Sequence, residues 1–399
     1  MTQASPLSCQ RGAFSLPRDV HYLNCAYMGP LPLASQEAGI AGIRRKAVPT
    51  ITASEFFEES DEARALFARV LGAAEPRRVA IMPSVSYGIA IAARNLPCAR
   101  GQNIVVAAEQ FPANVYAWRR LTRERGAELR TVAAPVAAPP RAAAWSEAIL
   151  AATDDATAIV ALPHVHWTDG TRFDLVQIAE RARRMGAAFV VDGSQSIGPL
   201  DLEFDRVRPD AVLCAAYKWL LGPYGLAFGW FGPRFDDGVP LEETWIGRQG
   251  SEDFQRLVDY RDEYQPGAVR YDVGERSNFI LLPMALASLR LVLEWGSARI
   301  QQYCDALFAD VLAEAESLGY SIEPRAGRAA HLFGLRVPHG SELRALHDAL
   351  QQRRVFASLR GSALRVAPNV YNDEADADAL LAALRATTTA IAGTSAALP

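Results

Sequence analysis

Short apolar runs alternate with amphipathic segments between about residue 55 and residue 235. The apolar runs have the length of buried strands, and the segments between them place hydrophobic residues at a helical period. This alternation is typical of a parallel sheet that helices cover on both faces, so the sequence predicts an α/β fold. The predicted strands are Val79–Met82, Ile104–Val106, Ala158–Leu162, Ala187–Val191, Ala211–Cys214 and Leu226–Trp230, and the predicted helices are Glu58–Leu71, Val85–Arg94, Ala113–Arg125 and Leu175–Met185.

The last third of the chain follows a different pattern. A helical pattern runs from Asn278 to about Trp295, breaks at Gly296 and continues as a second helix to Leu318. Shorter strand and helix patterns then alternate, which predicts a smaller α+β domain attached through a connecting helix. A chain of 399 residues also exceeds the usual size of one hydrophobic core. We therefore expect an N-terminal segment at 1–50, a large domain at 51–277 and a small domain at 278–399, with the proline-rich stretch 133–140 as an exposed connection.

The composition is that of an ordinary globular protein, with 50% hydrophobic and 22% charged residues. A net charge of −4 gives no indication of a nucleic-acid partner or of an anionic membrane surface. No apolar stretch reaches the length of a transmembrane helix, and residues 1–6 lack the features of a signal peptide. We therefore expect a cytoplasmic protein that binds neither nucleic acid nor membrane.

Cysteine and histidine spacing indicates neither a disulfide framework nor a metal site. The five cysteines contain no C-x-x-C pair, and His164 and His166 stand two residues apart without a further cluster to complete a ligand set. The chain also lacks a G-x-G-x-x-G sequence after a strand and a Walker-type phosphate loop. We therefore expect reduced thiols and no bound metal, and nicotinamide and nucleoside triphosphate cofactors are disfavoured.

Lysine is nearly absent from the chain. Of the 41 basic residues only Lys46 and Lys218 are lysine, and Lys218 lies within the apolar run 212–221. A desolvated lysine loses its proton and becomes a nucleophile that can condense with an aldehyde, whereas arginine stays protonated. Taken alone, Lys218 could equally be a lysine that reaches from a strand end to solvent.

An aspartate upstream decides between these two interpretations. Asp192 ends the apolar run 187–191, and a second apolar strand separates it from Lys218. This layout is used to hold pyridoxal phosphate: the lysine forms a Schiff base with the aldehyde, and the carboxylate pairs with the pyridinium nitrogen. Asp192 alone would more often be a strand-end cap or a metal ligand. Both residues fall at the carboxyl ends of strands, where open α/β sheets bind ligands, so we predict a pyridoxal phosphate cofactor.

The phosphate of such a cofactor needs backbone N–H donors, which a helix N-terminus supplies. The predicted strand Val79–Met82 turns through Ser84, Val85 and Ser86 into the following helix. A Ser-x-Ser before a helix is more often a simple N-cap. In this order of strands, these three residues are the first choice for a phosphate cradle.

The chain resembles the class V aminotransferase family of fold-type I pyridoxal-phosphate enzymes, which contains cysteine desulfurases, selenocysteine lyases, isopenicillin N epimerase and kynureninase. The resemblance runs from the segment 22–32 to the segment 364–372, and its most specific motifs are Asp192-Gly193-Ser194-Gln195-Ser196 and Tyr217-Lys218. It implies a fold with a large domain, whose mostly parallel sheet is sandwiched by helices, and a smaller α+β C-terminal domain. It also implies a homodimer with active sites at the subunit interface.

The resemblance further implies roles for individual residues. Asp192 would bind the pyridine nitrogen, Gln195 the ring hydroxyl or imine region, and Lys218 would form the internal aldimine. Phe111 matches an aromatic residue that stacks on the cofactor, Tyr217 and Trp245 match residues that reach the phosphate, and Arg365 matches the anchor of the substrate α-carboxylate. Asn24, Ala26 and Tyr27 match the N-terminal segment that lines the substrate pocket. A core tryptophan at 245, and an ion-paired arginine at 365, are the ordinary alternatives.

Two departures from the family bear on the reaction. Desulfurases carry a catalytic cysteine shortly before the substrate arginine, and the stretch 350–361 contains none. Trp167 stands where desulfurases have asparagine, and Gln195 stands where kynureninases have histidine, so neither subgroup is matched in full. We expect an enzyme that acts on a small amino acid by transamination or β-elimination. Kynureninase-like hydrolysis, epimerisation, and a non-enzymatic amino-acid sensor remain the alternatives.

Overall fold

The computed structural model describes residues 5–135, 140–337, 343–361 and 363–395. At its centre lies a seven-stranded sheet with the order β2-β8-β7-β6-β5-β3-β4. Strand β8 runs antiparallel to its neighbours β2 and β7, and the other neighbouring strands pair in parallel. The strands are β2 (Val79–Met82), β3 (Asn103–Ala107), β4 (Glu128–Val132), β5 (Thr157–Pro163), β6 (Ala188–Asp192), β7 (Ala211–Ala215) and β8 (Ala227–Phe231).

The antiparallel direction of β8 follows from the length of the segment before it. Residues 216–226 connect β7 to β8 and contain no helix. A parallel strand needs a crossover connection of a dozen or more residues, usually a helix, so this segment returns the chain in the opposite direction. Lys218 lies in this connection, in a turn three residues beyond the end of β7.

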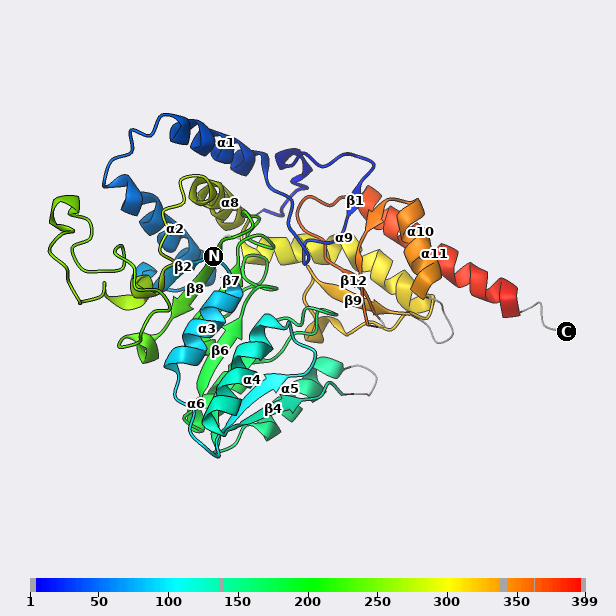
Figure 1. Ribbon diagram of the computed structural model, residues 1–399. Coiled ribbons are helices and arrows are strands. Elements are labelled where there is room, and N and C mark those ends of the chain that lie inside the picture. The colour runs from blue at the N-terminus through cyan, green and yellow to red at the C-terminus, as the bar shows by residue number, and fades with distance from the viewer. Residues whose placement is uncertain (1–4, 136–139, 338–342, 362, 396–399) are drawn as a thin grey trace.

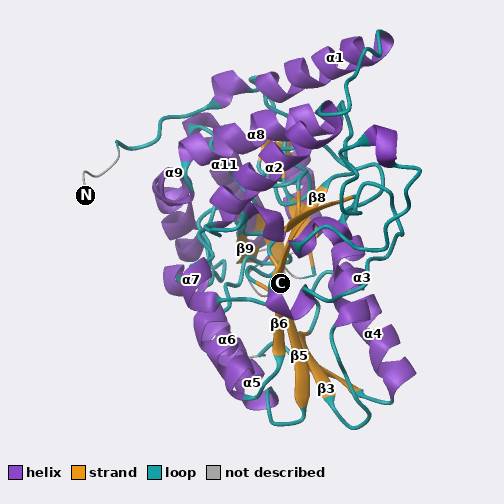
Figure 2. Cartoon of the chain, turned by 90° about the vertical axis from the view of Figure 1, so that its left-hand side faces the viewer, coloured by secondary structure: helices purple, strands orange, loops and turns teal. Residues whose placement is uncertain are grey.

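Helices cover both faces of the sheet (Figure 2). Helix α3 begins where Ser84 accepts a hydrogen bond from the Tyr87 N–H, and α6 begins where Asp174 accepts one from the Gln177 N–H. Helix α2 ends at Gly72, whose φ of 77° favours glycine. The helices of this domain are α2 (Glu55–Leu71), α3 (Val85–Asn95), α4 (Ala113–Arg125), α5 (Arg141–Ala152), α6 (Leu175–Arg184), α7 (Phe204–Val207) and α8 (Leu281–Trp295).

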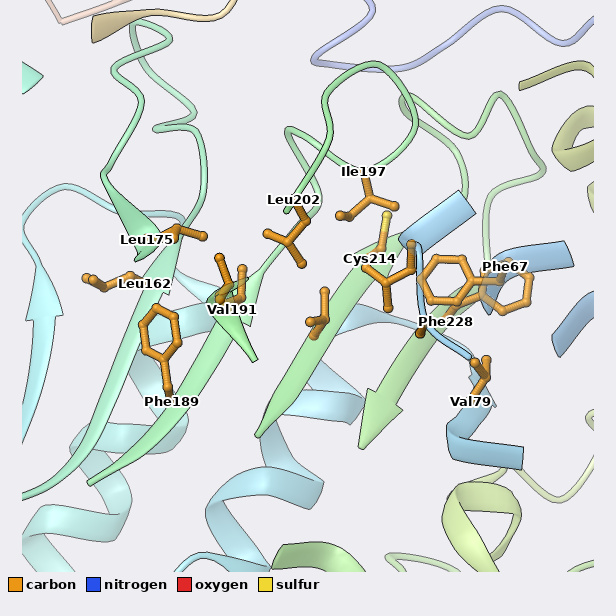
Figure 3. Packing of buried hydrophobic residues seen from close by; sticks show 14 of the residues in the cluster. Phe67, Val79, Leu162, Leu175, Phe189, Val191, Ile197, Leu202, Cys214 and Phe228 are labelled. Atoms are coloured by element: carbon orange, nitrogen blue, oxygen red, sulfur yellow. The ribbon is translucent and has the colours of Figure 1, made fainter. Parts of the chain in front are cut away.

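Alternate residues of each strand point to opposite faces and form two separate cores. On one face Phe189 and Val191 of β6 pack with residues from α2 and α6, and Phe67 stacks on Phe228 with ring centroids 4.9 Å apart (Figure 3). On the other face Ala188 and Val190 pack with residues of α3 and α4. Asp192 has the same parity as Ala188 and Val190, so the strand directs its side chain toward the face that carries α3.

The smaller domain is built on a three-stranded antiparallel sheet with the order β11-β12-β9. Helix α9 begins at the bend after α8 and runs into this domain (Figure 1). The N-terminal segment joins the same domain, because β1 pairs in parallel with β10 and Asn24 forms a bridge to Ala367. The elements here are β1 (His21–Tyr22), α9 (Ser297–Ser317), β9 (Phe333–Arg336), α10 (Leu343–Gln352), β10 (Val355–Phe356), β11 (Ser358–Arg360), β12 (Ala363–Val366) and α11 (Glu374–Ser395). Helix α1 (Leu33–Ala47) packs on α8 of the large domain.

The predicted fold class is confirmed, including the mostly parallel sheet and the smaller C-terminal unit. Strand β4 and helix α5 were missing from the predicted elements. They flank the expected connection 133–140, of which residues 136–139 lie outside the described residues. Within the described ranges, no single helix is long and apolar enough to cross a membrane, although α8 and α9, bent by 71°, pass that test together by length and composition. The proposed domain boundaries stay a prediction.

Candidate active site

A cavity of about 230 Å³ opens where the carboxyl ends of the central strands meet. Its wall comes from the turn between β2 and α3, the segments that follow β3 and β5, the end of β6, and the connection between β7 and β8. Eight of the predicted site residues line it: Ser84, Val85, Ser86, Phe111, Asp192, Gln195, Tyr217 and Lys218. Residues more than 100 positions apart in the chain therefore converge on one site.

The Lys218 amine is buried in this cavity, with 6% of the residue exposed. Burial lowers the pKa of Lys218 to about 8, with Arg365 contributing to the decrease and Asp192 opposing it. The amine lies 5.2 Å from the centroid of the Phe111 ring. Among the described residues, no carboxylate lies within ion-pair distance of it. The amine is thus far more often neutral near pH 7 than an exposed lysine, as a nucleophile requires.

The N-terminal segment fixes the turn that carries Lys218. The Gly29 N–H donates a 2.8 Å hydrogen bond to the Tyr217 carbonyl. A Cβ atom on Gly29 would lie 2.2 Å from the Lys218 carbonyl oxygen, so this close approach requires glycine. The lysine is therefore held by backbone packing, and its side chain remains available for chemistry.

The lowered pKa predicts a pH dependence for cofactor capture. Neutral amine attacks an aldehyde, and a group whose pKa is lowered stays neutral to lower pH. The rate at which pyridoxal phosphate combines with the apoenzyme should therefore rise with a midpoint near pH 8, the pKa of Lys218. The appearance of the visible absorption band after mixing, followed from about pH 6 to about pH 10, measures this rate. A rate that shows no midpoint and still rises steeply at about pH 10 would fit the ordinary lysine pKa of 10.5 and show that burial does not activate the amine.

Asp192 presents a buried carboxylate to the same cavity. The residue is 7% exposed, and its Oδ1 accepts a 3.0 Å hydrogen bond from the Ser194 N–H. No lysine, arginine or histidine within the described ranges forms an ion pair with it. A buried carboxylate is stable when a cation or further donors compensate its charge. A protonated pyridine nitrogen would be such a partner, so the donor set fits pyridoxal phosphate.

The turn before α3 also fits the cofactor, at its phosphate end. The first N–H groups of a helix have no partner within the helix and carry its positive dipole end. Ser84 caps the Tyr87 N–H at 3.2 Å, and its hydroxyl lies 3.0 Å from the Ser86 hydroxyl. The N-cap and phosphate interpretations are therefore compatible, because the cap leaves N–H groups and a second hydroxyl at the cavity wall.

Gln195 forms hydrogen bonds to three other segments of the chain. Its Nε2 donates to the Ala26 carbonyl at 3.1 Å, and its Oε1 accepts from the Trp219 indole N–H at 2.8 Å. Its backbone carbonyl lies 2.8 Å from Nε2 of the buried His331. Gln195 thus ties the N-terminal segment to the turn that carries Lys218. Its predicted contact with the cofactor remains a prediction.

Arg365 on β12 is 1% exposed and has no carboxylate within ion-pair distance among the described residues. Its Nη1 donates to the Trp167 carbonyl at 2.8 Å, its Nη2 donates to Asn24 Oδ1 at 3.3 Å, and its buried Nε has no partner. Burial, with the positive charge of Arg360, lowers the pKa of Arg365 to about 9. A buried guanidinium without a counter-ion is suited to an anionic ligand.

Other predicted residues lie away from the cavity wall. Tyr27 is 59% exposed. Asn24 accepts a hydrogen bond from Arg365, and Ala26 accepts one from Gln195. Trp245 is 39% exposed and packs edge-on against Phe56, Phe57 and Phe254. It lines a separate cavity of about 410 Å³. Within one chain Trp245 therefore does not join the site, and its role at the phosphate stays a prediction.

The sequence did not single out three polar residues at the cavity wall. Tyr224 packs on Tyr217 with ring centroids 4.7 Å apart. Gln110 and Asn114 flank Phe111, and the buried Gln110 Oε1 and Asn114 Nδ2 have no partner in the described part of the chain. Gln110 follows the end of β3 by three residues, so its place after a strand end was the available signal for it.

The cysteines do not contribute to the cavity wall. Cys25, Cys98, Cys214 and Cys304 are buried, and Cys9 is exposed. Burial raises the pKa of the Cys25 thiol to about 12, which disfavours the nucleophilic thiolate. The described residues also hold no group of three or more His, Cys, Asp or Glu side chains that could bind a metal ion.

Buried lysine, buried aspartate and a helix N-terminus around one cavity define the kind of site that holds pyridoxal phosphate. Residues 45–242 match the model of the aminotransferase class-V family, and the chain belongs to that family of pyridoxal-phosphate enzymes. This match confirms the predicted family and the predicted class of enzyme.

Two relatives illustrate the range of the family. The chain is 27% identical to the uncharacterised aminotransferase YcbU of Bacillus subtilis, over 80% of this chain and 81% of the relative. It is 26% identical to isopenicillin N epimerase of Streptomyces clavuligerus, over 95% and 97% of the two chains. Among solved structures, a variant of C-DES with glycine covalently linked to its PLP cofactor superposes with a TM-score of 0.78 at 20% identity, covering 94% of this chain and 98% of that one. This last likeness supports the fold.

Proposed function

We propose that the chain acts on a small amino acid by transamination or β-elimination, with Lys218 and Asp192 as catalytic residues. The observation that carries this proposal is that Lys218 and Asp192 are both buried in one cavity, and neither forms an ion pair with a described residue. Arg365, which also has no carboxylate partner among the described residues, donates a hydrogen bond to the carbonyl of Trp167, a residue of the cavity wall. Pyridoxal phosphate, when bound there, would supply an aldehyde carbon and an electron-withdrawing ring.

Each residue of the site would have a role that follows from its position in the cavity. Lys218 would bind the cofactor and, once the substrate amine displaces it, hold and return the proton of the substrate α-carbon at its Nζ. Asp192 would keep the pyridine nitrogen protonated. Residues Ser84 to Ser86 would bind the phosphate through N–H and hydroxyl groups. Phe111, which lines the cavity near the Lys218 amine, would stack on the ring and exclude water from one face.

Epimerisation is the second candidate, because the isopenicillin N epimerase relative aligns over nearly the whole of both chains. Lys218 would exchange the proton on one face of the α-carbon, and inversion would need a second proton donor on the opposite face. The cysteine positions disfavour a persulfide mechanism, since none of the five thiols lines the cavity.

Product identification tests the proposed function. The holoenzyme would be mixed with a panel of amino acids, and ketoacid, ammonia, sulfide, alanine and racemised amino acid would be quantified. Ketoacid formed together with amino-form cofactor indicates transamination, and ammonia with ketoacid indicates elimination. Inverted amino acid as the sole product would support epimerisation. A spectral change without any product would indicate a sensor and contradict the proposal.

Arg365→Ala should reduce kcat/KM for the amino acid by roughly 30- to 1,000-fold while leaving the visible band of the holoenzyme unchanged. The reason is that Arg365 is assigned to the substrate carboxylate through a charge-assisted, bidentate contact. Arg365→Lys should recover part of the loss, because an ammonium group cannot present the same planar fork. Steady-state kinetics and the absorption spectrum measure both effects. Unchanged amino-acid affinity combined with a lost visible band would assign Arg365 to the cofactor or to structure.

A homodimer is the proposed state in solution. Helix α1 exposes Leu33, Ile40 and Ile43, which share one side of the helix by their spacing, and Tyr224 is exposed at the cavity. Light scattering at low micromolar concentration should give twice the mass of the 43.3 kDa chain. Replacing Ile40 and Ile43 by glutamate should shift the protein toward monomer. A wild-type protein of 43.3 kDa would contradict the dimer.

A further inference from the structure

Besides the cavity at Trp245, a further cavity of about 330 Å³ lies against the candidate active site and is called the second cavity below. Glu109, Thr168 and Asp169 line it, whereas the adjoining residues Phe111 and Trp167 line the site itself. The segment that follows β3 and the segment that follows β5 therefore form part of the wall of both cavities. Trp167 joins the segments, because its indole N–H donates to the Glu109 carbonyl at 2.6 Å.

This second cavity has an excess of positive charge. Its wall contains the guanidinium groups of Arg141, Arg336 and Arg360 and the carboxylates of Glu109 and Asp169. Asp169 pairs with both Arg336 and Arg141. Arg360 forms no ion pair with any described carboxylate. Because Asp169 is shared by two arginines, the positive excess is spread over the wall, and Arg360 is its one arginine without a carboxylate partner among the described residues.

Arg360 is positioned against Trp167. Its guanidinium carbon lies 5.5 Å from the centroid of the Trp167 ring, its Nη1 donates to the Leu359 carbonyl at 2.8 Å, and its buried Nε has no partner. A guanidinium on an aromatic face is held in place while its remaining N–H groups stay available. The arrangement leaves the Nε donor of Arg360 without an acceptor among the described residues.

Sheet register places Arg360 beside Arg365. In the antiparallel pair β11–β12, Ser358 lies opposite Arg365 and Arg360 lies opposite Ala363. Residues opposite one another, and residues two apart on one strand, share a face, so both arginines point to the same side as diagonal neighbours about 7–8 Å apart. Two like charges this close repel, and Arg360 contributes to the lowered pKa of Arg365. Two anionic groups on one ligand would relieve that repulsion.

We propose that Arg360 binds an acidic group at the end of the substrate side chain, so that the substrate is an amino acid with a second anion. Arg365, bonded to the Trp167 carbonyl, takes the α-carboxylate, and Arg360, which lies over the Trp167 ring, takes the distal acid. This inference rests on the proposed function and adds the substrate class. A carboxylate, a sulfonate and a phosphate ester share the required chemistry.

Matched pairs of amino acids test the assignment. Aspartate with asparagine, glutamate with glutamine, and 2-aminoadipate with its δ-amide differ in the distal charge at nearly constant shape. Cysteate and O-phosphoserine separate the sulfonate and phosphate sources. For each, kcat/KM and the dissociation constant from the shift of the visible band would be measured with wild-type holoenzyme, Arg360→Gln and Arg360→Lys. Arg119→Gln, which removes an exposed arginine on α4, is the matched control.

The wild-type enzyme should prefer at least one acid over its amide by roughly 10- to 100-fold, the effect of one charge-assisted hydrogen bond. Arg360→Gln should remove that preference while changing kcat/KM for the amide by less than about threefold. Arg360→Lys should retain part of the preference for the acid, and Arg119→Gln should match the wild type. Equal losses for acid and amide, or neutral amino acids that react without any acid preference, would overturn the second-anion site alone. Failure of every amino acid to bind or react would overturn the proposed function as well.

Discussion

Lys218→Ala should lower kcat by about 10,000-fold or more, because the substitution removes both the amine that binds the cofactor and the base that moves the α-proton. Lys218→Arg should be equally inactive, since a guanidinium remains protonated and does not form the bond. Lys218→Ala should not reduce the thermal stability of the apoenzyme greatly, because the Lys218 side chain forms no ion pair with the described residues.

Lys46→Ala is the matched control for this experiment. Lys46 is exposed on α1 and is the other lysine of the chain. Its removal should leave turnover, the visible band and the melting temperature unchanged. A Lys218→Ala enzyme that retained more than about one tenth of wild-type turnover would show that another group performs the chemistry.

Asp192→Asn should reduce kcat by about 100- to 1,000-fold with little change in shape, because an amide cannot supply the charge that keeps a pyridine nitrogen protonated. The variant should still bind pyridoxal phosphate, more weakly, and Asp192→Ala should bind it more weakly again. Kinetics and equilibrium titration of the cofactor measure the two effects separately. Asp237→Asn, at an exposed carboxylate, should behave as wild type. Undiminished turnover in Asp192→Asn would show that the pairing is assigned wrongly.

Much of the large domain was predictable because its strands are apolar on both faces and end at recognisable polar residues. The run before Asp192 became β6, and the run before Lys218 became β7. Periodicity alone did not fix the direction of β8, which depends on the short connection that carries Lys218. Strand β4 is partly exposed and polar, so it lacked the apolar signal that identified its neighbours.

The site residues that follow strand ends were predictable from the order of strands and the residue types. The site residues that are positioned by contacts between distant segments were not. Residues at the strand ends converge because parallel strands end at one edge of the sheet. The hydrogen bonds of Gln195 to Ala26 and Trp219 join three distant segments, and no local pattern encodes them. Trp245 matched a family position, but the fold of one chain places it in a separate aromatic cluster. No local pattern in the sequence pairs Arg360 with Arg365, because their proximity follows from the register of β11 and β12.

Borohydride reduction of the holoenzyme, followed by peptide mapping, tests the central claim most directly. The chain has two lysines, the buried Lys218 and the exposed Lys46, so the readout separates a specific site from surface modification. We expect one equivalent of reduced cofactor per chain, attached to Lys218, with no label on Lys46. Attachment to Lys46, or the absence of any reduced adduct on a protein saturated with pyridoxal phosphate, would contradict it.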